Sequence, residues 1–413
     1  MSLLQEVNLW GEDIPFLCGL RDKGRASFMR QSLPHAKTEA WKYSYFDEDE
    51  LQNPLIEDEP IKCDGHCHHE ENLPFKAVQI KYCNGKLHIG HSAAPQGLII
   101  KSLIEAIFDN DLKPYLNKTF DTDNFPFAAL NTACLEQGLF ILAESKTVLS
   151  EPIYIHYHNH DDKNRLCNIR NVIVAEGRSK ITVIEHFDGE ENAVYTQNTV
   201  NEIFIGSNAE LQHFVWQNEA AKAHHIALNS VQIKSGGNYE AFYAGGKCKF
   251  ARHESSIKLL NEGAQAKVNG VYRLQNKGQV SDITTNIRHL APHTFSDQLV
   301  KGVASVAAKG VFQGQIHIAP DAEQCEGNQL HRALIVDDNA EIDCKPELEI
   351  FADDVKCSHG ASCGDLDEEQ IFYLQSRGIN ENDARKILIE AYLNEVFVLN
   401  KNQEVSNWIK EQF

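Results

Sequence analysis

The sequence predicts a mainly β protein in which a core of short strands lies between helical regions at the two ends of the chain. First, residues 139–355 consist of short β-rich runs separated by small polar turns, with no long helical pattern among them. Second, a three-to-four spacing of apolar residues returns only after Gly364. Third, several turns resemble one another: EGRSKI at 176, GSNAEL at 206, EGAQAK at 262 and DDNAEI at 337.

The recurrence of these turns favours the stacked coils of a β-solenoid, in which each coil buries its inward face against the next. The spacing between the turns is irregular, so the repeat signal is weak. Short strands alone are also compatible with a β-sandwich. The residue pattern therefore leaves both architectures open.

Residues 1–135 have a mixed pattern of helices and turns. The aromatic cluster at 41–46 is expected to dock on the main body. A hairpin is predicted at 77–90, where Asn84 and Gly85 suit a tight type I′ turn. Helices are predicted in three stretches, Leu20–Leu33, 98–116 and 127–137.

Residues 366–413 are predicted to be helical. Asp367 can cap a helix from Glu368 to about Ser376, and a second helix starts at Asn380 or Asn382. The second helix carries an apolar stripe that can pack on the protein's own core or on a partner. The residues of this stripe that we take as candidate partner contacts are Ile387, Leu388, Ala391 and Tyr392.

Composition excludes several functional classes. The 413 residues are 42% hydrophobic, as in a folded chain, and the net charge of -20 argues against a nucleic-acid surface. The N-terminal stretch lacks the pattern of a signal peptide, and no apolar run approaches the ~20 residues needed to span a bilayer, so we expect a cytoplasmic protein. Eleven cysteines scattered through such a chain are expected to remain thiols.

Familiar catalytic motifs are missing from the sequence. There is no GxxxxGK[ST] phosphate loop, so no ATP site of its own is expected, and there is no dinucleotide fingerprint, GxSxG elbow or HExxH helix. A carbohydrate-active enzyme is a distant alternative, because Asp353 and Asp354 are adjacent in a strand and face opposite sides. We therefore expect a protein that is not an enzyme.

One cysteine- and histidine-rich segment, CDGHCHH, lies at 63–69. Its candidate ligands suit zinc, but structural zinc sites normally join two separated ligand pairs, and here all lie within seven positions. An adventitious metal-binding loop is the alternative. The residues concerned are Cys63, His66, Cys67, His68 and His69.

A second candidate site lies in the stretch 340–364. In an extended strand, Cys357 and His359 project from the same face, which places a thiol beside an imidazole. Both are ligand types for iron–sulfur or zinc chemistry once deprotonated. Cys363, four residues on, can approach the same place. The alternative is that these side chains are ordinary packed residues.

The run KPELEIFADDVKCSHGA at 345–361, followed by LDEEQIFYLQSRGI at 366–379, resembles the C-terminal signature of SufD proteins in the SufB/SufD family of iron–sulfur cluster assembly scaffolds. The similarity continues through TEAWKY at 38–43, FAALNTACLEQGLFI at 127–141 and VFQGQIHIAPDAEQ at 311–324. It implies a right-handed parallel β-helix core, which we assign to 136–365. Helical regions at 1–135 and 366–413 would flank that core.

The resemblance also implies partners and a site. A SufD-like chain would pair with a SufB-like subunit through the β-helix ends and bind a SufC-like ABC ATPase through its C-terminal helical region. His359 would lie at the SufB interface and supply a nitrogen ligand to a transient iron–sulfur cluster shared with that subunit. Cys357 would be a secondary ligand candidate, whereas Cys363 carries no role over from the family.

Other expectations follow less directly from the resemblance. A reduced flavin is associated with such complexes, but no stretch of this sequence identifies a flavin pocket. The isolated chain can form a homodimer. The main alternative is a purely architectural β-helix subunit that contributes no cluster ligand.

Overall fold

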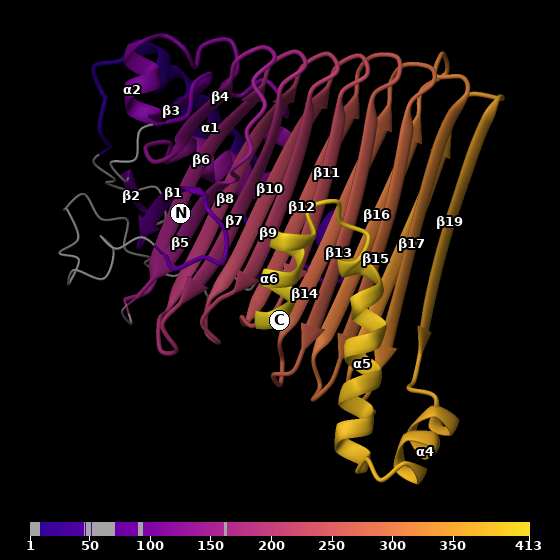
Figure 1. The fold of residues 1–413 in the computed structure, drawn as a ribbon. Helices are drawn as coiled ribbons and strands as arrows, with labels where there is room; N and C mark the ends of the chain where they lie inside the picture. The colour runs from indigo at the N-terminus through magenta and orange to yellow at the C-terminus, as the bar shows by residue number, and fades with distance from the viewer. Residues whose placement is uncertain (1–8, 45, 47–50, 52–70, 90–93, 161–162) are drawn as a thin grey trace.

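The computed structural model describes residues 9–44, 46, 51, 71–89, 94–160 and 163–413. Two long sheets face each other along the length of the molecule and enclose the core between them (Figure 1). Sheet 1 contains β1 (Val78–Cys83), β2 (Lys86–Ile89), β5 (Ile153–Asn159), β7 (Lys180–Gly189), β9 (Glu210–Asn218), β11 (Asn238–Gly245), β13 (Gln265–Leu274), β15 (Phe295–Ala304), β17 (Cys325–Ile335) and β19 (Val355–Gly364). Sheet 2 contains β3 (Leu98–Ser102), β4 (Leu139–Ala143), β6 (Arg165–Ala175), β8 (Tyr195–Ile205), β10 (His224–Ile233), β12 (Phe250–Leu259), β14 (Val280–His289), β16 (Lys309–Ile318) and β18 (Glu341–Ile350).

The chain alternates between the two sheets, so each strand from β5 to β17 pairs in parallel with the strand two places later. This is a β-solenoid of about seven turns, and it confirms the predicted β-helix over the sandwich, whose strands would be antiparallel. The period varies from 26 residues, between the paired His224 and Phe250, to 32 residues, between Lys309 and Glu341. This variation explains the irregular repeat in the sequence.

Side chains alternate in direction along each strand, so every second one points into the space between the two sheets. Apolar residues make most of this interior, but a ladder of asparagines runs through it. Asn171 donates to Asn201 over 2.9 Å, and Asn201 donates to Asn229 over 2.7 Å. Glu185 accepts from Asn201 and from the hydroxyl of Tyr157. The buried polar groups of successive coils therefore satisfy one another and hold the coils in register.

The hairpin at the N-terminal side is confirmed. β1 and β2 pair antiparallel, and the turn residues Asn84 and Gly85 have φ values of 46° and 78°, as a type I′ turn requires. β1 also pairs in parallel with β5, so the hairpin extends sheet 1. The predicted aromatic cluster docks as expected: Trp41 and Phe46 are buried against the solenoid.

The helix predicted at 98–116 is only partly correct. Its first five residues form β3, because they pair antiparallel with β4 at the end of sheet 2. Helix α2 (Leu103–Phe108) then starts at a capping box formed by Ser102 and Glu105. The chain leaves the helix at Asn110, where φ is 61°.

The other two N-terminal helices are shifted from their predicted bounds. Helix α1 (Pro15–Gln31) begins five residues early, with proline in its first turn. Helix α3 (Pro126–Ala133) ends before Gln137, because that residue already bridges to Ile169 of sheet 2. Two short 3₁₀ turns, η2 (Glu39–Trp41) and η5 (Thr122–Asn124), connect these elements.

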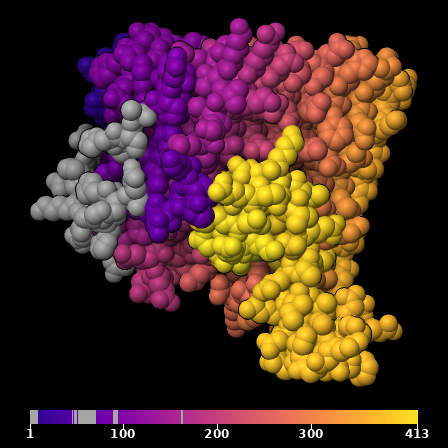
Figure 2. Space-filling model, in the orientation of Figure 1, coloured from indigo at the N-terminus to yellow at the C-terminus, as the bar shows by residue number. Residues whose placement is uncertain are grey.

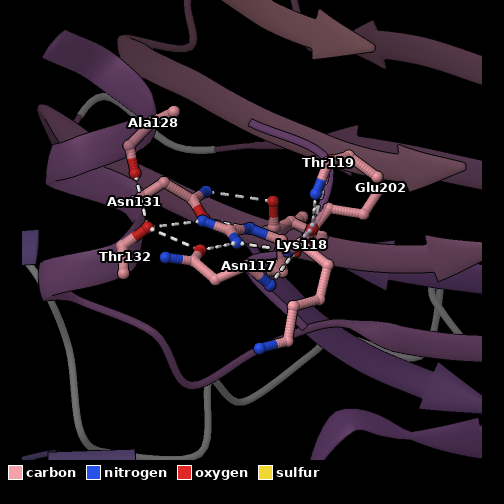
Figure 3. A network of polar contacts seen from close by, with 9 residues as sticks. Asn117, Lys118, Thr119, Ala128, Asn131, Thr132 and Glu202 are labelled. Atoms are coloured by element: carbon pink, nitrogen blue, oxygen red, sulfur yellow. Dashed lines mark hydrogen bonds and ion pairs between the residues drawn. The ribbon is translucent and has the colours of Figure 1, made fainter. Parts of the chain in front are cut away.

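A buried polar network joins helix α3 and residues 117–119 to sheet 2 (Figure 3). Glu202 accepts hydrogen bonds from the backbone N–H groups of Asn117, Lys118 and Thr119. Arg170 donates to Asn131 of α3 over 3.0 Å. The solenoid's first coils therefore hold this region through ionised side chains as well as apolar contacts.

The C-terminal helices begin where predicted. Asp367 caps α4 (Glu368–Ser376) and Asn380 caps α5 (Glu381–Phe397), which is followed by α6 (Gln403–Gln412). Helices α5 and α6 pack on the outer face of sheet 1, whereas α4 projects past the edge of the sheets and contacts α5 (Figures 1 and 2). Among the described residues, no helix is long and apolar enough to cross a membrane.

Candidate functional site

The solenoid ends in two strands, β18 and β19, that each pair on one side only. β18 pairs with β16 and β19 pairs with β17, and in the described part of the chain no strand adds to their other edges. Figure 1 shows β19 at the outer limit of the sheets, at the end opposite to α2. We call this end, with the side chains that β18 and β19 turn inward, the open end.

Cys357 and His359 belong to the inward-facing row of β19. Their register partners in β17 are Gly327 and Gln329, which are buried in the interior. Because no further coil covers the row, His359 is exposed and Cys357 is partly buried. The predicted sharing of one strand face is therefore present, and it opens to solvent.

The open end brings in a thiol that sequence reasoning missed. Cys344 of β18 pairs in register with the buried Phe312, so it also faces inward. Burial and the neighbouring thiol of Cys363 raise the pKa of Cys344 to about 12. Cys344 and Cys363 therefore lie on opposite sheets but within electrostatic range of each other. Cys344 could have been found only from the register between strands of successive coils. The spacing of residues along the sequence does not reveal that register.

Below this row lies a stack of rings that closes the interior. His331 stacks on Phe312 with centroids 5.0 Å apart, and the hydroxyl of Tyr272 lies 3.1 Å from its Nε2. Burial lowers the pKa of His331 to about 4, so this ring is neutral at neutral pH. The floor of the open end is thus uncharged and packed.

The thiols at the open end are protonated in the isolated chain. Burial raises the pKa of both Cys357 and Cys363, and the backbone of Gly327 offsets part of this for Cys357. A bound metal or a cationic partner would have to displace these protons before sulfur could act as a ligand or nucleophile.

Two family descriptions match the chain. The SufBD protein N-terminal region matches residues 5–155, and the SufBD core domain of the SUF system for FeS cluster assembly matches residues 157–392. This chain belongs to the SufBD family. The iron–sulfur cluster assembly protein SufD of Escherichia coli is 30% identical over 387 residues, which cover 89% of this chain and 85% of that protein.

Other relatives are similar over shorter stretches. An iron–sulfur cluster assembly SufBD family protein of Synechocystis is 31% identical over 294 residues, 69% of this chain, and one of Staphylococcus haemolyticus is 26% identical over 304 residues, 72% of this chain. The aligned part covers 64% of each of these two proteins, just under two thirds of their length. The SufBD chain described here is thus a homologue of SufD and an iron–sulfur cluster assembly protein.

The apolar stripe of α5 in this SufBD protein divides between core and surface. Leu388 and Tyr392 are partly buried against the solenoid, whereas Ile387 and Ala391 are exposed. Lys301 of β15 fixes the helix by donating to the carbonyl of Tyr392 over 3.1 Å and by pairing with Glu395. The segment CDGHCHH at 63–69, the other predicted cluster of ligands, lies outside the described residues.

Proposed function

We propose that this SufBD protein is the SufD-type subunit of a cytoplasmic scaffold on which iron–sulfur clusters are built. It pairs through its open end with a SufB-type subunit and binds a SufC-type ATPase through α4 and α5. At the shared interface it contributes to iron acquisition and to holding a transient cluster. It carries no ATP site of its own and serves as a non-catalytic scaffold subunit.

The observation that carries this proposal is the position of His359, which is exposed in a strand whose outer edge pairs with no other described strand. An unpaired strand edge offers backbone N–H and C=O groups to a strand of another chain. Docking there would place a partner's side chains against His359 and Cys357. Imidazole and thiolate both suit iron, so the two chains would complete one set of ligands.

The surface proposed for the ATPase is the exposed side of α4 and α5. Phe372 and Tyr373 of α4 are 71% and 57% exposed, and Ile387 of α5 is 43% exposed. Large aromatic side chains that protrude from a rigid helix are typical anchors of protein interfaces. Because α4 stands away from the sheets, a partner can reach it without disturbing the solenoid.

The ligand role is tested with His359→Ala in the reconstituted complex of the three subunit types. We expect the complex to assemble and hydrolyse ATP at its usual rate, while the iron and acid-labile sulfide that it accumulates fall at least tenfold. The matched control is Ser358→Ala, because Ser358 lies next to His359 on the opposite face and hydrogen-bonds Asn328. This control should build clusters normally.

Two results would change the proposal. Normal cluster formation by His359→Ala would leave only the architectural role for this chain. Failure of the unaltered chain to associate with a second β-helix subunit or an ABC-type ATPase would contradict the scaffold itself. Homodimerisation of the isolated chain through the open end would compete with the first partner, so association is measured with that partner in excess.

The ATPase surface is tested separately with the pair Phe372→Ala and Tyr373→Ala. We expect affinity for the SufC-type subunit to fall at least tenfold, since anchors of this kind contribute about 2 kcal/mol or more when removed. Phe108→Ala is the control, because Phe108 of α2 is 64% exposed at the other end of the molecule. Equal binding by both variants would place the ATPase elsewhere.

A further inference from the structure

A second cluster of potential metal ligands lies on the outer face of sheet 1, at the N-terminal end of the solenoid. One ligand atom each of His156, His186 and Asp188 lies within 4.8 Å of the others. His156 of β5 pairs in register with His186 of β7, so the two imidazoles sit side by side on adjacent strands. Their outward direction follows from alternation, because Ile155 and Tyr157 fill the interior.

The Nδ1 atom of each imidazole faces a side chain outside the proposed ligand set. Nδ1 of His156 lies 3.1 Å from a carboxylate oxygen of Glu71, and its Nε2 lies 3.0 Å from Oδ1 of Asp188. Nδ1 of His186 bonds the hydroxyl of Tyr154 over 2.7 Å, which leaves Nε2. A carboxylate behind a histidine is the usual outer partner of a metal-bound imidazole, and Glu71 occupies that place.

The ring nitrogens of His156 face two carboxylates but are poorly aligned with them. Its side chain is almost wholly buried, yet neither ring nitrogen makes a well-aligned hydrogen bond within the described residues, despite the two nearby carboxylates. Buried polar groups normally have hydrogen-bond partners, and an exception calls for an explanation. A metal ion between Nε2 of His156 and Asp188 would supply one.

Two of the three side chains already have the protonation state that a metal needs. Burial lowers the pKa of His186 to about 3, so its ring is neutral and keeps a lone pair at neutral pH. Burial opposes the ionisation of Asp188, but His156 and His158 outweigh it and hold the pKa of this carboxyl well below its usual range. Neutral imidazole and ionised carboxylate are the forms that bind metal. For His156, burial lowers the pKa but Asp188 and Glu71 outweigh it and raise the pKa, so a metal ion would have to displace the proton of this ring.

We propose that His156, His186 and Asp188 hold one divalent transition-metal ion, Zn²⁺ or Fe²⁺, on the outer face of sheet 1. Two imidazoles and one carboxylate suit these ions, whereas Mg²⁺ and Ca²⁺ take oxygen ligands. At metal–ligand distances of about 2.0–2.2 Å, two ligands of one ion lie at most ~4.4 Å apart. The cluster therefore has to close by roughly half an ångström, with the nearly parallel imidazoles turning toward each other.

The site lies under the C-terminal helix and far from the open end. Trp408 of α6 contacts the rings of His186 and Tyr154 at centroid distances of 5.7 Å and 5.9 Å. Six strand steps of about 4.8 Å separate β7 from β19, or roughly 29 Å. A metal here would therefore fasten two strands beneath α6 and would be distinct from any cluster bound at His359.

The experiment measures metal binding to the full chain without an affinity tag. The background variant carries His66→Asn, His68→Asn and His69→Asn, so that the segment at 63–69 adds little to the signal. After chelator treatment, Zn²⁺ alone or, under anaerobic conditions, Fe²⁺ alone is titrated, and bound metal and tryptophan fluorescence are recorded. We expect one equivalent per chain and a fluorescence change that saturates at that ratio, because Trp216 and Trp408 flank His186.

His186→Asn and Asp188→Asn should each weaken binding at least tenfold, whereas His317→Asn, on the outer face of the distant β16, should bind like the background. Equal binding by His186→Asn and the background, or no bound metal in the background, would overturn the proposal. If a variant fails to fold, the absorption spectrum of Co²⁺ bound to the background variant tests the ligand set instead. We expect a spectrum of nitrogen and oxygen ligands, and an intense thiolate charge-transfer band would place the metal elsewhere.

Discussion

Nη1 of Arg170 lies 3.1 Å from Oε1 of Glu202, and neither side chain has any exposure to solvent. The pair spans two neighbouring strands of sheet 2, β6 and β8, and also reaches the N-terminal region through three backbone N–H groups and α3. A buried ion pair adds little stability over an apolar pair, but the loss of one partner leaves an uncompensated charge. The link between the solenoid and the N-terminal helices is thus sensitive to single substitutions.

Glu202→Gln is therefore expected to lower the free energy of unfolding by about 3–5 kcal/mol, measured by urea denaturation. The substitution keeps the shape of the side chain but leaves the guanidinium of Arg170 unpaired. Glu210→Gln is the matched control, since the pair that Glu210 makes with Lys180 at 2.7 Å is exposed and should contribute at most about 1 kcal/mol. Similar losses of unfolding free energy in the two variants would show that the buried pair contributes no more to stability than the exposed one.

The interior of the last coils offers a second test. A Cβ on Gly302 would lie 1.9 Å from the ring of Tyr272, which is fully buried and bonds His331. Gly302→Ala is expected to cost about 1–3 kcal/mol by overpacking and to disturb the floor of the open end. The readout is the free energy of unfolding together with the near-ultraviolet signal of the aromatic rings.

Gly270→Ala provides the control for that substitution. A Cβ on Gly270 would meet its nearest neighbours at 3.5 Å or more, which is ordinary contact. Its stability should stay within about 1 kcal/mol of the unaltered chain, with any gain arising from the less flexible unfolded state. Destabilisation as large as that of Gly302→Ala would reject the steric explanation.

Local signals in the sequence predicted the elements that depend on nearby residues. The Asn84 and Gly85 turn, the cap at Asp367 and the cap at Asn380 are all set by residues within one turn of the element they start or reverse. The residue pattern alone did not predict the solenoid, because the length of the repeat changes from coil to coil. It was the resemblance to a family that separated it from a sandwich.

Features that depend on pairing between distant segments were not predictable. Residues 98–102 carry helical spacing, but their pairing with β4 makes them a strand. Cys344 comes within electrostatic range of Cys363 because β18 and β19 end the two sheets together. His156 and His186 are 30 positions apart in sequence and become neighbours only through the register of β5 and β7. In each case a segment distant in the sequence supplies the neighbour, so the sequence of one segment cannot reveal it.

Buried neutral histidines predict a pH dependence of stability. Burial lowers the pKa of His289 to about 4, and its two ring nitrogens bond the hydroxyls of Thr294 and Ser296. Between pH ~6.5 and ~4 this histidine is protonated in the unfolded chain but not in the folded one. The unfolded state therefore gains a proton, and stability falls as pH falls through this window, by up to about 1.4 kcal/mol per pH unit.

His289→Asn removes this titration, so its free energy of unfolding should decline less steeply over the same window than that of the unaltered chain. The measurement is urea denaturation at several pH values, and the comparison of slopes cancels the groups that the two chains share. His293→Asn is the control because that ring is half-exposed. Identical slopes in all three chains would show that His289 does not titrate differently on folding.

Thiol reactivity reports on the open end directly. Thiolate is the reacting form, so a raised pKa slows alkylation at neutral pH, and the rate should climb as pH approaches the pKa. Exposed Cys363 should react with iodoacetamide before the half-buried Cys357, and Cys344, whose pKa is raised to about 12, should react last. Mass spectrometry of the labelled chain gives the order.

If a SufB-type subunit covers the open end, its addition should protect Cys357 and Cys363 several-fold against the same reagent. Cys18 is the internal reference, because it is partly buried in α1 and lies at the other end of the molecule. Its rate should not change when the partner is added. Protection of Cys18 with continued labelling of Cys363 would move the interface to the N-terminal end. A subunit that covers the open end would shield the inward-facing side chains of β19, including Cys363, from the reagent.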